Sequence, residues 1–311
     1  MSGAPGTRRA GGPAGRGLVA PALPASLRCR IGSWRRLARP AARVRRIVFV
    51  EGMGVPLDLD LDGTDAPAVH LVLSHGGRAI GTGRLLPRDA RIGRVAVLAP
   101  FRGRGLGRQI VVRLMREAVR LGLPEVELHA QAYAVDFYRR LGFHAFGPLF
   151  DDAGIPHRRM RRSLAWHSAV AGVLVDGRRF LLGRRAPGLV MGERWDLFGG
   201  RIERSETPTR ALARELREEL GIEARIGPRL AVSLYDDPRD GTVFRCPVHL
   251  VTRWKGEIVL NPEHTAWRRL WLSQVGRLRL AHPGIPRLCA EARRRAAGSR
   301  PARNSGSRCI V

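Results

Sequence analysis

Apolar residues recur at every fourth position between Thr207 and Gly221, and this spacing predicts an amphipathic helix. A threonine can cap free backbone N–H groups, and Pro208 suits the first helical position because no N–H is needed there. Gly221 supplies the end of the helix. The apolar stripe consists of Leu212, Leu216 and Leu220. Glutamates lie beside this stripe, so the helix presents a carboxylate-rich face next to its packing face.

Short apolar runs on the N-terminal side of this helix predict strands at 27–34, 69–73, 78–85, 92–98 and 125–130. Between them the pattern predicts a helical stretch at 35–50, which Pro40 interrupts early, and a helix at 108–121. Further strands are predicted at 169–175, 178–182, 195–198, 228–235 and 244–254, and a last helix at 282–292. This mixture of helices and strands predicts an α/β (α+β) fold, and 311 residues are enough for two compact domains.

The two ends of the chain have little to pack. Residues 1–26 and 293–311 are rich in Gly, Ala, Pro and Arg, and we expect both to be disordered basic tails. No apolar run approaches membrane-spanning length, and no membrane partner is expected. The four cysteines lack paired or metal-ligand spacing, which favours a reducing compartment and a cytoplasmic location. They are Cys29, Cys246, Cys289 and Cys309.

The net charge of +28 favours attraction to anionic molecules, including nucleotides, coenzyme A and RNA. Lys255 is the only lysine, so arginine supplies nearly all of the positive charge. The abundance of Gly, Ala, Pro and Arg is typical of GC-rich coding. We therefore expect no dedicated nucleic-acid module, although a basic RNA-associated protein without turnover remains an alternative.

Glu215, Glu218 and Glu219 fall at i, i+3 and i+4 and share one face of the predicted helix. Crowded carboxylates repel one another unless a positive charge lies among them, and Mg²⁺ prefers oxygen ligands while keeping waters that a phosphate oxygen can replace. The alternative is a solvated face on which the glutamates pair with Arg214 and Arg217.

The longer spacing from Gly200 through Glu206, Arg214–Glu215 and Glu218–Glu219 to Gly221 resembles the Nudix box at every defined position. The resemblance implies hydrolysis of a nucleoside-diphosphate-linked substrate with Mg²⁺ or Mn²⁺. It implies an α/β/α sandwich at 165–292. The implied metal ligands are the carboxylates of Glu215, Glu218, Glu219 and Glu263 and the carbonyl of Gly199. Glu215 would also orient or activate water, and Arg214 would hold the loop through Glu206. Phe198 stands where many members have proline.

Downstream of the strand at 92–98, a glycine-rich loop precedes the helix at 108–121. Loop N–H groups and the helix dipole together form an anion site, and glycines let a phosphate approach closely. Arg102, Gly105 and Gly107 occur at the spacing of the acetyl-CoA pyrophosphate loop of the GNAT acyltransferases. The run from Tyr133 to Phe143 resembles the later segment of that family, in which a helix ends in Gly–Phe.

The GNAT resemblance covers 27–164 and implies a mixed sheet with flanking helices and acetyl transfer from acetyl-CoA to an amine. The residues implied to contact the coenzyme are Val97, Arg102, Arg104, Gly105, Leu106, Gly107 and Arg108. Tyr138 aligns with the tyrosine that protonates the departing thiolate, and packing on the sheet is the alternative role. The base stays open among Glu51, Asp151, Asp152 and His157, all expected in loops.

Other assignments stay open. Trp195 and Phe198 either stack on a nucleobase or belong to the core, and Arg184 and Arg185 lie where phosphates could be steered. The Nudix half could instead be a nucleotide-sensing module that regulates the acyltransferase. The identity of the nucleotide, the amine acceptor and the oligomeric state do not follow from the sequence.

Overall fold

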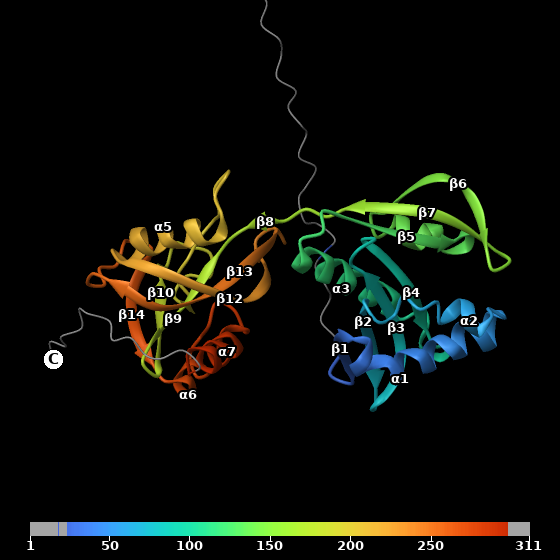
Figure 1. The fold of residues 1–311 in the computed structure, drawn as a ribbon, viewed down its shortest axis with the longest axis horizontal. Coiled ribbons are helices and arrows are strands. Elements are labelled where there is room, and N and C mark those ends of the chain that lie inside the picture. The colour runs from blue at the N-terminus through green and yellow to red at the C-terminus, as the bar shows by residue number, and fades with distance from the viewer. Residues whose placement is uncertain (1–17, 19–23, 298–311) are drawn as a thin grey trace, which may run out of the picture. The chain divides into compact units, whose positions relative to one another are not determined.

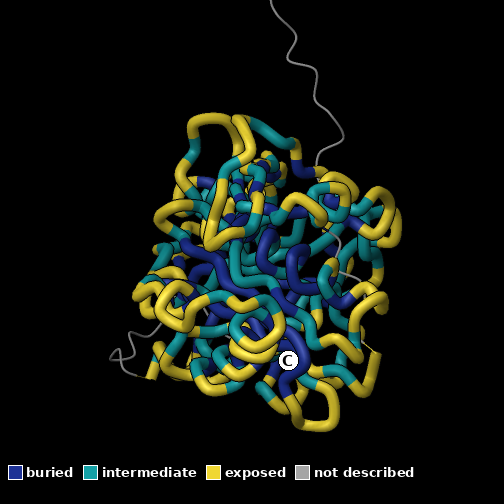
Figure 2. Tube along the Cα trace, turned by 90° about the vertical axis from the view of Figure 1, so that its right-hand side faces the viewer, coloured by how far each residue is buried: buried dark blue, intermediate teal, exposed yellow. Residues whose placement is uncertain are grey.

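The structure, a computed structural model, describes Leu18 and residues 24–297. These residues divide into two compact units between Trp166 and His167, each with its own sheet and helices (Figure 1). The predicted α/β fold class is confirmed. Buried residues run through the interior, and exposed ones lie mainly in the outer turns (Figure 2). Among the described residues, no helix is both long enough and apolar enough to cross a membrane.

The N-terminal unit contains a seven-stranded sheet with the order β1-β2-β3-β4-β5-β7-β6. All neighbouring strands are antiparallel except β4 and β5, which are parallel. The strands are β1 (Leu27–Ser33), β2 (Val69–His75), β3 (Arg78–Leu86), β4 (Arg91–Val97), β5 (Glu125–Gln131), β6 (His144–Asp152) and β7 (Ile155–Ser163).

The first helix, α1 (Trp34–Arg45), follows β1 directly and continues into a π-helical turn, η1 (Arg46–Glu51). Pro40 lies inside α1, so the expectation that it interrupts the helix early is wrong. The helix tolerates the missing N–H because its apolar stripe is buried against the sheet. The stripe consists of Leu37, Ala41 and Val44, which pack with Val72, Ala79 and Ala96. A short helix, α2 (Leu57–Asp60), follows.

Helix α3 (Leu106–Leu121) approaches β3 closely at a glycine. A Cβ added to Gly83 would lie 2.7 Å from Ile110 Cγ2 and 2.9 Å from Leu114 Cδ1, so a larger residue would push α3 away from the sheet. The remaining helical segments of this unit are η2 (Ala99–Phe101), η3 (Ala132–Ala134) and α4 (Val135–Arg139).

Strands β4 and β5 pair only near the start of β4. Arg91 pairs with Glu127 and Ile92 with Leu128, yet β4 continues to Val97 and β5 to Gln131. Arg94 has a φ of +52°, and the β3–β4 register shifts between Thr82 and Arg84, which is the geometry of a β-bulge. The two strands therefore separate beyond Ile92 and leave the middle of the sheet open.

A buried ionic network ties α1, α2 and the following loop to β3 and β4. Arg45 Nε donates to both carboxylate oxygens of Asp60 at 3.1 Å, and Arg45 Nη1 donates to Asp65 Oδ1 at 2.7 Å. Arg84 Nη1 donates to the same Asp65 oxygen at 2.7 Å, and Arg84 Nη2 donates to Asp62 Oδ2 at 2.6 Å. Arg45 and Asp60 are only 1% and 2% exposed, so these charges depend on each other rather than on water.

Asp62 and Asp65 remain ionised in this network despite their burial. Burial alone would raise the pKa of Asp62 and Asp65, but hydrogen bonds from Arg84, and for Asp65 also from Arg45, hold both pKa values below their usual range. The leucines that alternate with the aspartates, Leu57, Leu59 and Leu61, are all exposed, whereas Asp60 and Asp65 are buried.

The C-terminal unit also has a seven-stranded sheet, with the path β11-β10-β9-β13-β12; β14 pairs with β10, and β8 pairs with β13. The strands are β8 (His167–Ser168), β9 (Ala171–Asp176), β10 (Arg179–Arg185), β11 (Trp195–Asp196), β12 (Glu223–Asp236), β13 (Val243–Lys255) and β14 (His264–Leu270). Strand β9 is parallel to β13 and antiparallel to β10.

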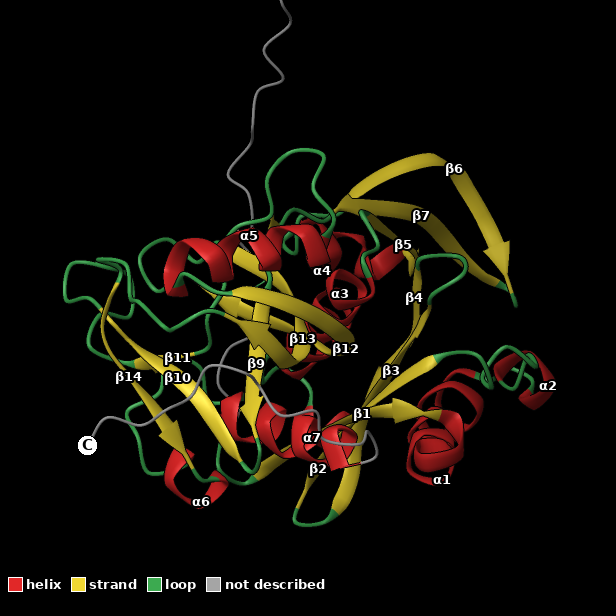
Figure 3. Ribbon diagram, turned by 60° about the vertical axis from the view of Figure 1, so that its left-hand side comes forward, coloured by secondary structure: helices red, strands yellow, loops and turns green. Residues whose placement is uncertain are grey.

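Helices cover both faces of this sheet, as the predicted sandwich requires (Figure 3). Helix α5 (Pro208–Leu220) buries Leu212, Leu216 and Leu220 on one face, and α6 (Leu272–Val275) and α7 (Ile285–Ala297) cover the other. The helix predicted between Thr207 and Gly221 is confirmed: Thr207 Oγ1 accepts from Arg210 N at 3.3 Å, and Gly221 ends the helix in the left-handed conformation.

The tail predictions need correction at both ends. Helix α7 runs to Ala297, five residues into the predicted tail, because Arg294 and Arg295 both pair with Glu291 and Ala296 packs on the core. Leu18 lies within the other predicted tail but is buried, and its carbonyl accepts from Arg116 Nη1 at 3.2 Å. Residues 24–26 of that tail are described as well and form a turn into β1, where Leu27 N donates to Pro24 O at 2.8 Å. The other residues of both tails lie outside the described part of the chain. The three described cysteines are unpaired, and Cys309 also lies outside.

Replacing Arg45 with methionine should destabilise the N-terminal unit strongly, since it leaves Asp60 and Asp65 buried with less positive charge. Removing one partner of a buried ion pair typically lowers the free energy of unfolding by about 3–5 kcal/mol. Hydrogen exchange of β2 and β3 amides in the full chain measures this change. Arg46→Met is the matched control, because Arg46 pairs with Glu51 at an exposed position. Equal protection in both variants would contradict the role of the network.

Candidate active sites

The loop before α5 runs against the carboxylates of that helix. Gly199 has a φ of +139°, and a Cβ there would lie 2.2 Å from Val170 O, so glycine is required. Gly199 N donates to Glu219 Oε2 at 2.8 Å. A Cβ added to Gly200 would lie 2.4 Å from the Glu215 carboxyl group. These two glycines therefore let the loop backbone contact two of the predicted ligands, Gly199 through its N–H.

Arg214 gathers the loop and the helix face around its guanidinium. Its Nε and Nη2 form a fork with the two carboxylate oxygens of Glu206 at 3.0 and 3.1 Å, which is the contact predicted for it. Its Nη1 donates to Glu215 Oε1 and to Glu218 Oε2, both at 3.0 Å. Its Nη2 also donates to Arg201 O at 3.0 Å, so one side chain holds five oxygens.

The carboxylates next to Arg214 are close enough to affect one another. Burial, together with the negative charges of Glu215 and Glu263, raises the pKa of Glu219 to about 8 despite the hydrogen bond from Gly199. Burial also raises the pKa of Glu215, against the opposing effect of Arg214. Glu263 lies in the turn before β14, where its carbonyl accepts from Ala186 N at 2.8 Å. Glu215 and Glu219 of α5 and Glu263 of the turn before β14 are therefore near enough to influence one another through their charges.

His264, the residue after Glu263, was missed by the sequence analysis. It is 5% exposed, and neither ring nitrogen has a hydrogen-bond partner among the described residues. Its Nδ1 lies 4.0 Å from Glu219 Oε1, and its ring lies 5.0 Å from the ring of Phe198. Burial lowers the pKa of His264 to about 4, so the ring is neutral at pH 7. A histidine at the start of a strand carries no local sign of such a contact.

The structure also shows the surroundings of the four neighbouring residues whose roles the sequence left open. Trp195 and Phe198 are 7% and 0% exposed and belong to the core, so neither offers a free face to a nucleobase. Arg184 pairs with Glu193 at 3.1 Å. Arg185 Nε donates to Val190 O at 2.8 Å, and its Nη1 lies 3.5 Å from Asp196.

In the N-terminal unit, the glycine-rich loop leads into the start of α3. Gly103 and Gly105 both have a positive φ, and Gly105 is the residue just before the helix. The first backbone N–H groups of a helix have no partner within the helix. At this end of α3 no described side chain caps them either. The loop is fastened to β4 because Arg102 Nε donates to Val97 O at 3.0 Å. Exposed N–H donors at a helix start suit a phosphate.

A cavity of about 830 Å³ extends from this loop into the opening between β4 and β5. Most of the predicted coenzyme residues line it: Val97, Arg102, Gly105, Leu106, Gly107 and Arg108. Arg104 does not, since its guanidinium lies over the Phe101 ring at 5.7 Å. The cavity continues to Phe49, Val55 and Leu59 from the segment between α1 and β2. One continuous space therefore joins the anion site to a partly apolar end.

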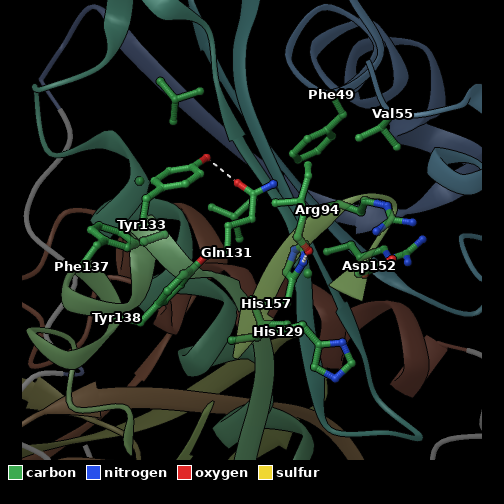
Figure 4. Close-up of a pocket in the computed structure, with 18 of the residues that line it drawn as sticks. Phe49, Val55, Arg94, His129, Gln131, Tyr133, Phe137, Tyr138, Asp152 and His157 are labelled. Atoms are coloured by element: carbon green, nitrogen blue, oxygen red, sulfur yellow. Dashed lines mark hydrogen bonds between the residues drawn. The ribbon is translucent and has the colours of Figure 1, made fainter. Parts of the chain in front are cut away.

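Tyr138 of α4 lines the cavity, and its ring lies against Phe137 and Phe143 with centroids 4.9 and 5.9 Å away. Figure 4 shows Tyr138 and Phe137 on one side of the space and Phe49 and Val55 on the other. Burial raises the pKa of Tyr138, so its phenol keeps a proton at neutral pH. The ring therefore both packs on its neighbours and reaches the cavity.

The candidate bases separate into two groups. Asp152 and His157 line the cavity, whereas Glu51 and Asp151 do not: Glu51 pairs with Arg46, and Asp151 accepts from Gly154 N at 2.9 Å. None of the four lies in a loop as expected. Glu51 ends η1, Asp151 and Asp152 end β6, and His157 lies in β7, because the charged run that follows His157 is extended and paired with β5.

Comparison with known proteins covers both units. A family model described as an acetyltransferase (GNAT) domain matches residues 64–164, and one described as a NUDIX domain matches residues 165–288. The uncharacterized N-acetyltransferase YjcF of Bacillus subtilis is 33% identical over 127 residues, which cover 40% of this chain and 91% of that protein. The 8-oxo-dGTP diphosphatase of Proteus vulgaris is 36% identical over 89 residues, which cover 28% of this chain and 78% of that protein. The chain belongs to both families: it joins a GNAT acetyltransferase domain to a Nudix domain.

A third relative also resembles the Nudix domain. The CTP pyrophosphohydrolase of Escherichia coli K12 is 40% identical over 62 residues, which cover 20% of this chain and 46% of that protein. Both family resemblances inferred from the sequence are therefore confirmed.

The candidate ligands of the Nudix domain are carboxylate oxygens that repel one another. Oxygen ligands of this kind are the ones that a hard divalent cation prefers. In the described residues, no three acidic, histidine or cysteine side chains converge as a complete ligand set. Glu215 and Glu218 bind Arg214, and Glu219 binds Gly199 N. The oxygen donors therefore suit a hard cation in kind, and Arg214 holds the carboxyl groups of Glu215 and Glu218 on the same helix face.

Gly200→Ala should weaken Mn²⁺ binding by about tenfold or more, because its Cβ would displace the Glu215 carboxyl group by steric overlap rather than by backbone strain. Gly188→Ala is the matched control, since a Cβ there meets nothing within 4 Å and Gly188 also has no positive φ. Titration of the purified full chain with Mn²⁺, followed by electron paramagnetic resonance, measures both affinities. Unchanged binding in Gly200→Ala would show that Glu215 is not where the cation binds.

Proposed function

We propose that the Nudix domain hydrolyses a nucleoside-diphosphate-linked compound with Mg²⁺ or Mn²⁺. The supporting observation is the gathering of Glu206, Glu215 and Glu218 by Arg214 beside the Gly199–Gly200 backbone. The named activities of the Proteus vulgaris and Escherichia coli relatives favour a nucleoside triphosphate as the substrate. When bound, the cation neutralises phosphate charge and lowers the pKa of a bound water.

In this proposal, Glu215, Glu218 and Glu219 supply carboxylate oxygens, with Glu263 and the Gly199 carbonyl as further donors. Glu215 is the residue that orients or activates the attacking water, since its carboxyl group lies directly against Gly200. Arg214 positions Glu215 and Glu218 and fastens the loop to the helix through Glu206. Water attacks phosphorus, and the bond between phosphorus and the bridging oxygen breaks.

We also propose that residues 27–164 transfer an acetyl group from acetyl-CoA to an amine. The supporting observation is the single cavity that joins the uncapped start of α3 to the opening between β4 and β5. The loop N–H groups at Gly103–Arg108 would hold the coenzyme phosphates. The thioester would then lie near Tyr138, which keeps its proton and can donate it to the departing thiolate. The second domain is proposed at 165–292, and both domains would act on small molecules in the cytoplasm.

Glu218→Gln should reduce metal-dependent nucleotide hydrolysis by about a hundredfold or more and leave acetyl-CoA binding unchanged. A panel of nucleotides with Mg²⁺ or Mn²⁺, analysed for released phosphate, diphosphate and nucleoside monophosphate, measures this. Glu223→Gln is the control, because Glu223 is an exposed carboxylate just after the same helix. Full hydrolysis by pure Glu218→Gln protein would rule out the site.

Tyr138→Phe should lower the rate of acetyl transfer by about a hundredfold without changing acetyl-CoA affinity, since it removes only the proton donor. Tyr133→Phe is the matched control: Tyr133 is 74% exposed, and its hydroxyl donates to Gln131. Thiol release from acetyl-CoA in the presence of primary amines measures the rate. A rate equal to that of the control would assign Tyr138 a packing role only.

A further inference from the structure

His157 lies in β7, where it is 8% exposed and lines the cavity of the GNAT domain. Its Nδ1 lies 2.8 Å from the Ile155 carbonyl oxygen. A carbonyl only accepts hydrogen bonds, so Nδ1 must carry the proton. In the neutral ring the remaining nitrogen, Nε2, then holds a free lone pair. The backbone of β7 therefore fixes His157 in the tautomer that can accept a proton.

The ring of His157 lies between the two ends of the cavity. In Figure 4, His157 lies near the middle of the space, with Tyr138 on one side and Phe49 and Val55 on the other. The loop that would bind the coenzyme phosphates lies at the Tyr138 end, since Gly107 is packed against Phe137. An acceptor that enters from the Phe49 end would therefore pass His157 on its way to the coenzyme.

The other titratable groups along the cavity are less suited to take a proton. Asp60 and Asp62 are engaged by Arg45, Arg84 and Arg94. Burial and the charges of Arg91 and Arg159 lower the pKa of His129, whose ring contacts Phe150 at 5.0 Å. Asp152 ends β6 and acts on His129 through its charge. His157 is the member of this set with a backbone contact that fixes its tautomer.

We propose that His157 Nε2 is the general base that removes a proton from the acceptor amine, a proposal that rests on the acetyl transfer proposed above. The amine nitrogen attacks the thioester carbonyl carbon, a carbon–nitrogen bond forms, and the carbon–sulfur bond breaks. His157 takes the proton from nitrogen, and Tyr138 gives one to sulfur. The products are an N-acetylated amine and coenzyme A. His157 then releases its proton to solvent, and Tyr138 takes one back from solvent.

The end of the cavity beyond His157 indicates the class of acceptor. Phe49, Val55 and Leu59 form an apolar wall there, and Arg94 is held by Asp62 and by the carbonyls of Leu59 and Asp60. The arginines nearest this wall are thus occupied by aspartates and carbonyls. A primary amine on an apolar body, such as phenethylamine, therefore suits this end better than an amino acid, which needs a partner for its carboxylate.

Chemical rescue tests this role in the full chain. His157→Ala should lower kcat for phenethylamine acetylation by about a hundredfold, leave acetyl-CoA affinity within about twofold, and recover part of the rate when imidazole is added. Imidazole can take the proton only where the substitution has made room for it. His157→Gln can keep a donor to Ile155 O but cannot act as a base, so it should lose the rate without rescue.

His129→Ala is the control, because its ring lines the same cavity without the Ile155 contact, and it should lose less activity and show no rescue. A His157→Ala rate close to that of the wild type would overturn the proposal. So would a loss that imidazole does not restore in a variant that binds acetyl-CoA normally. A wild-type chain that acetylates no amine would instead contradict the transfer itself, and His157 with it.

Discussion

Contacts between arginine and carboxylate groups hold the elements of both candidate sites in position. Arg214 binds Glu206 with both ends of its guanidinium and reaches Glu215 and Glu218 as well. In the GNAT domain, Arg45 and Arg84 share Asp65, and the segment that lines the far end of the cavity depends on them. Clustered carboxylates repel one another, and in both domains a rigid, permanently charged guanidinium lies among them.

Steric limits at glycine complete these arrangements. Gly199 and Gly200 admit the loop backbone to Glu219 and Glu215, and Gly83 admits α3 to the sheet that carries the acetyltransferase cavity. At Gly83 and Gly200 the constraint is the space that a Cβ would occupy, and at Gly199 the left-handed φ adds to it. At these three glycines a carboxylate, a helix or another backbone segment lies so close that a side chain would not fit.

Local signals allowed much of this structure to be predicted. The helix after Thr207 and the strands β1–β5 and β9–β13 follow from capping residues and periodicity, and the pairing of Arg214 with Glu206 follows from the Nudix resemblance. Strands β6, β7, β8 and β14 were not predicted. The ionic network did not, because Arg45 and Arg84 meet Asp65 only after folding brings distant segments together. The sequence does contain three aspartates from residue 60 to residue 65, in a chain of net charge +28. This acidic cluster was the feature from which buried arginine partners could have been predicted. Pro40 and the end of α7 were misjudged because tertiary packing outweighed local preference.

The short pairing between β4 and β5 divides the acetyltransferase sheet into two parts. Strands β1–β4 form one leaf and β5–β7 another, and a seam of only two residue pairs, at Arg91 and Ile92, joins their backbones. Backbone pairing therefore fixes the spacing of β4 and β5 only at this end, and no ladder between the two strands sets the width of the opening from Ile92 toward Val97.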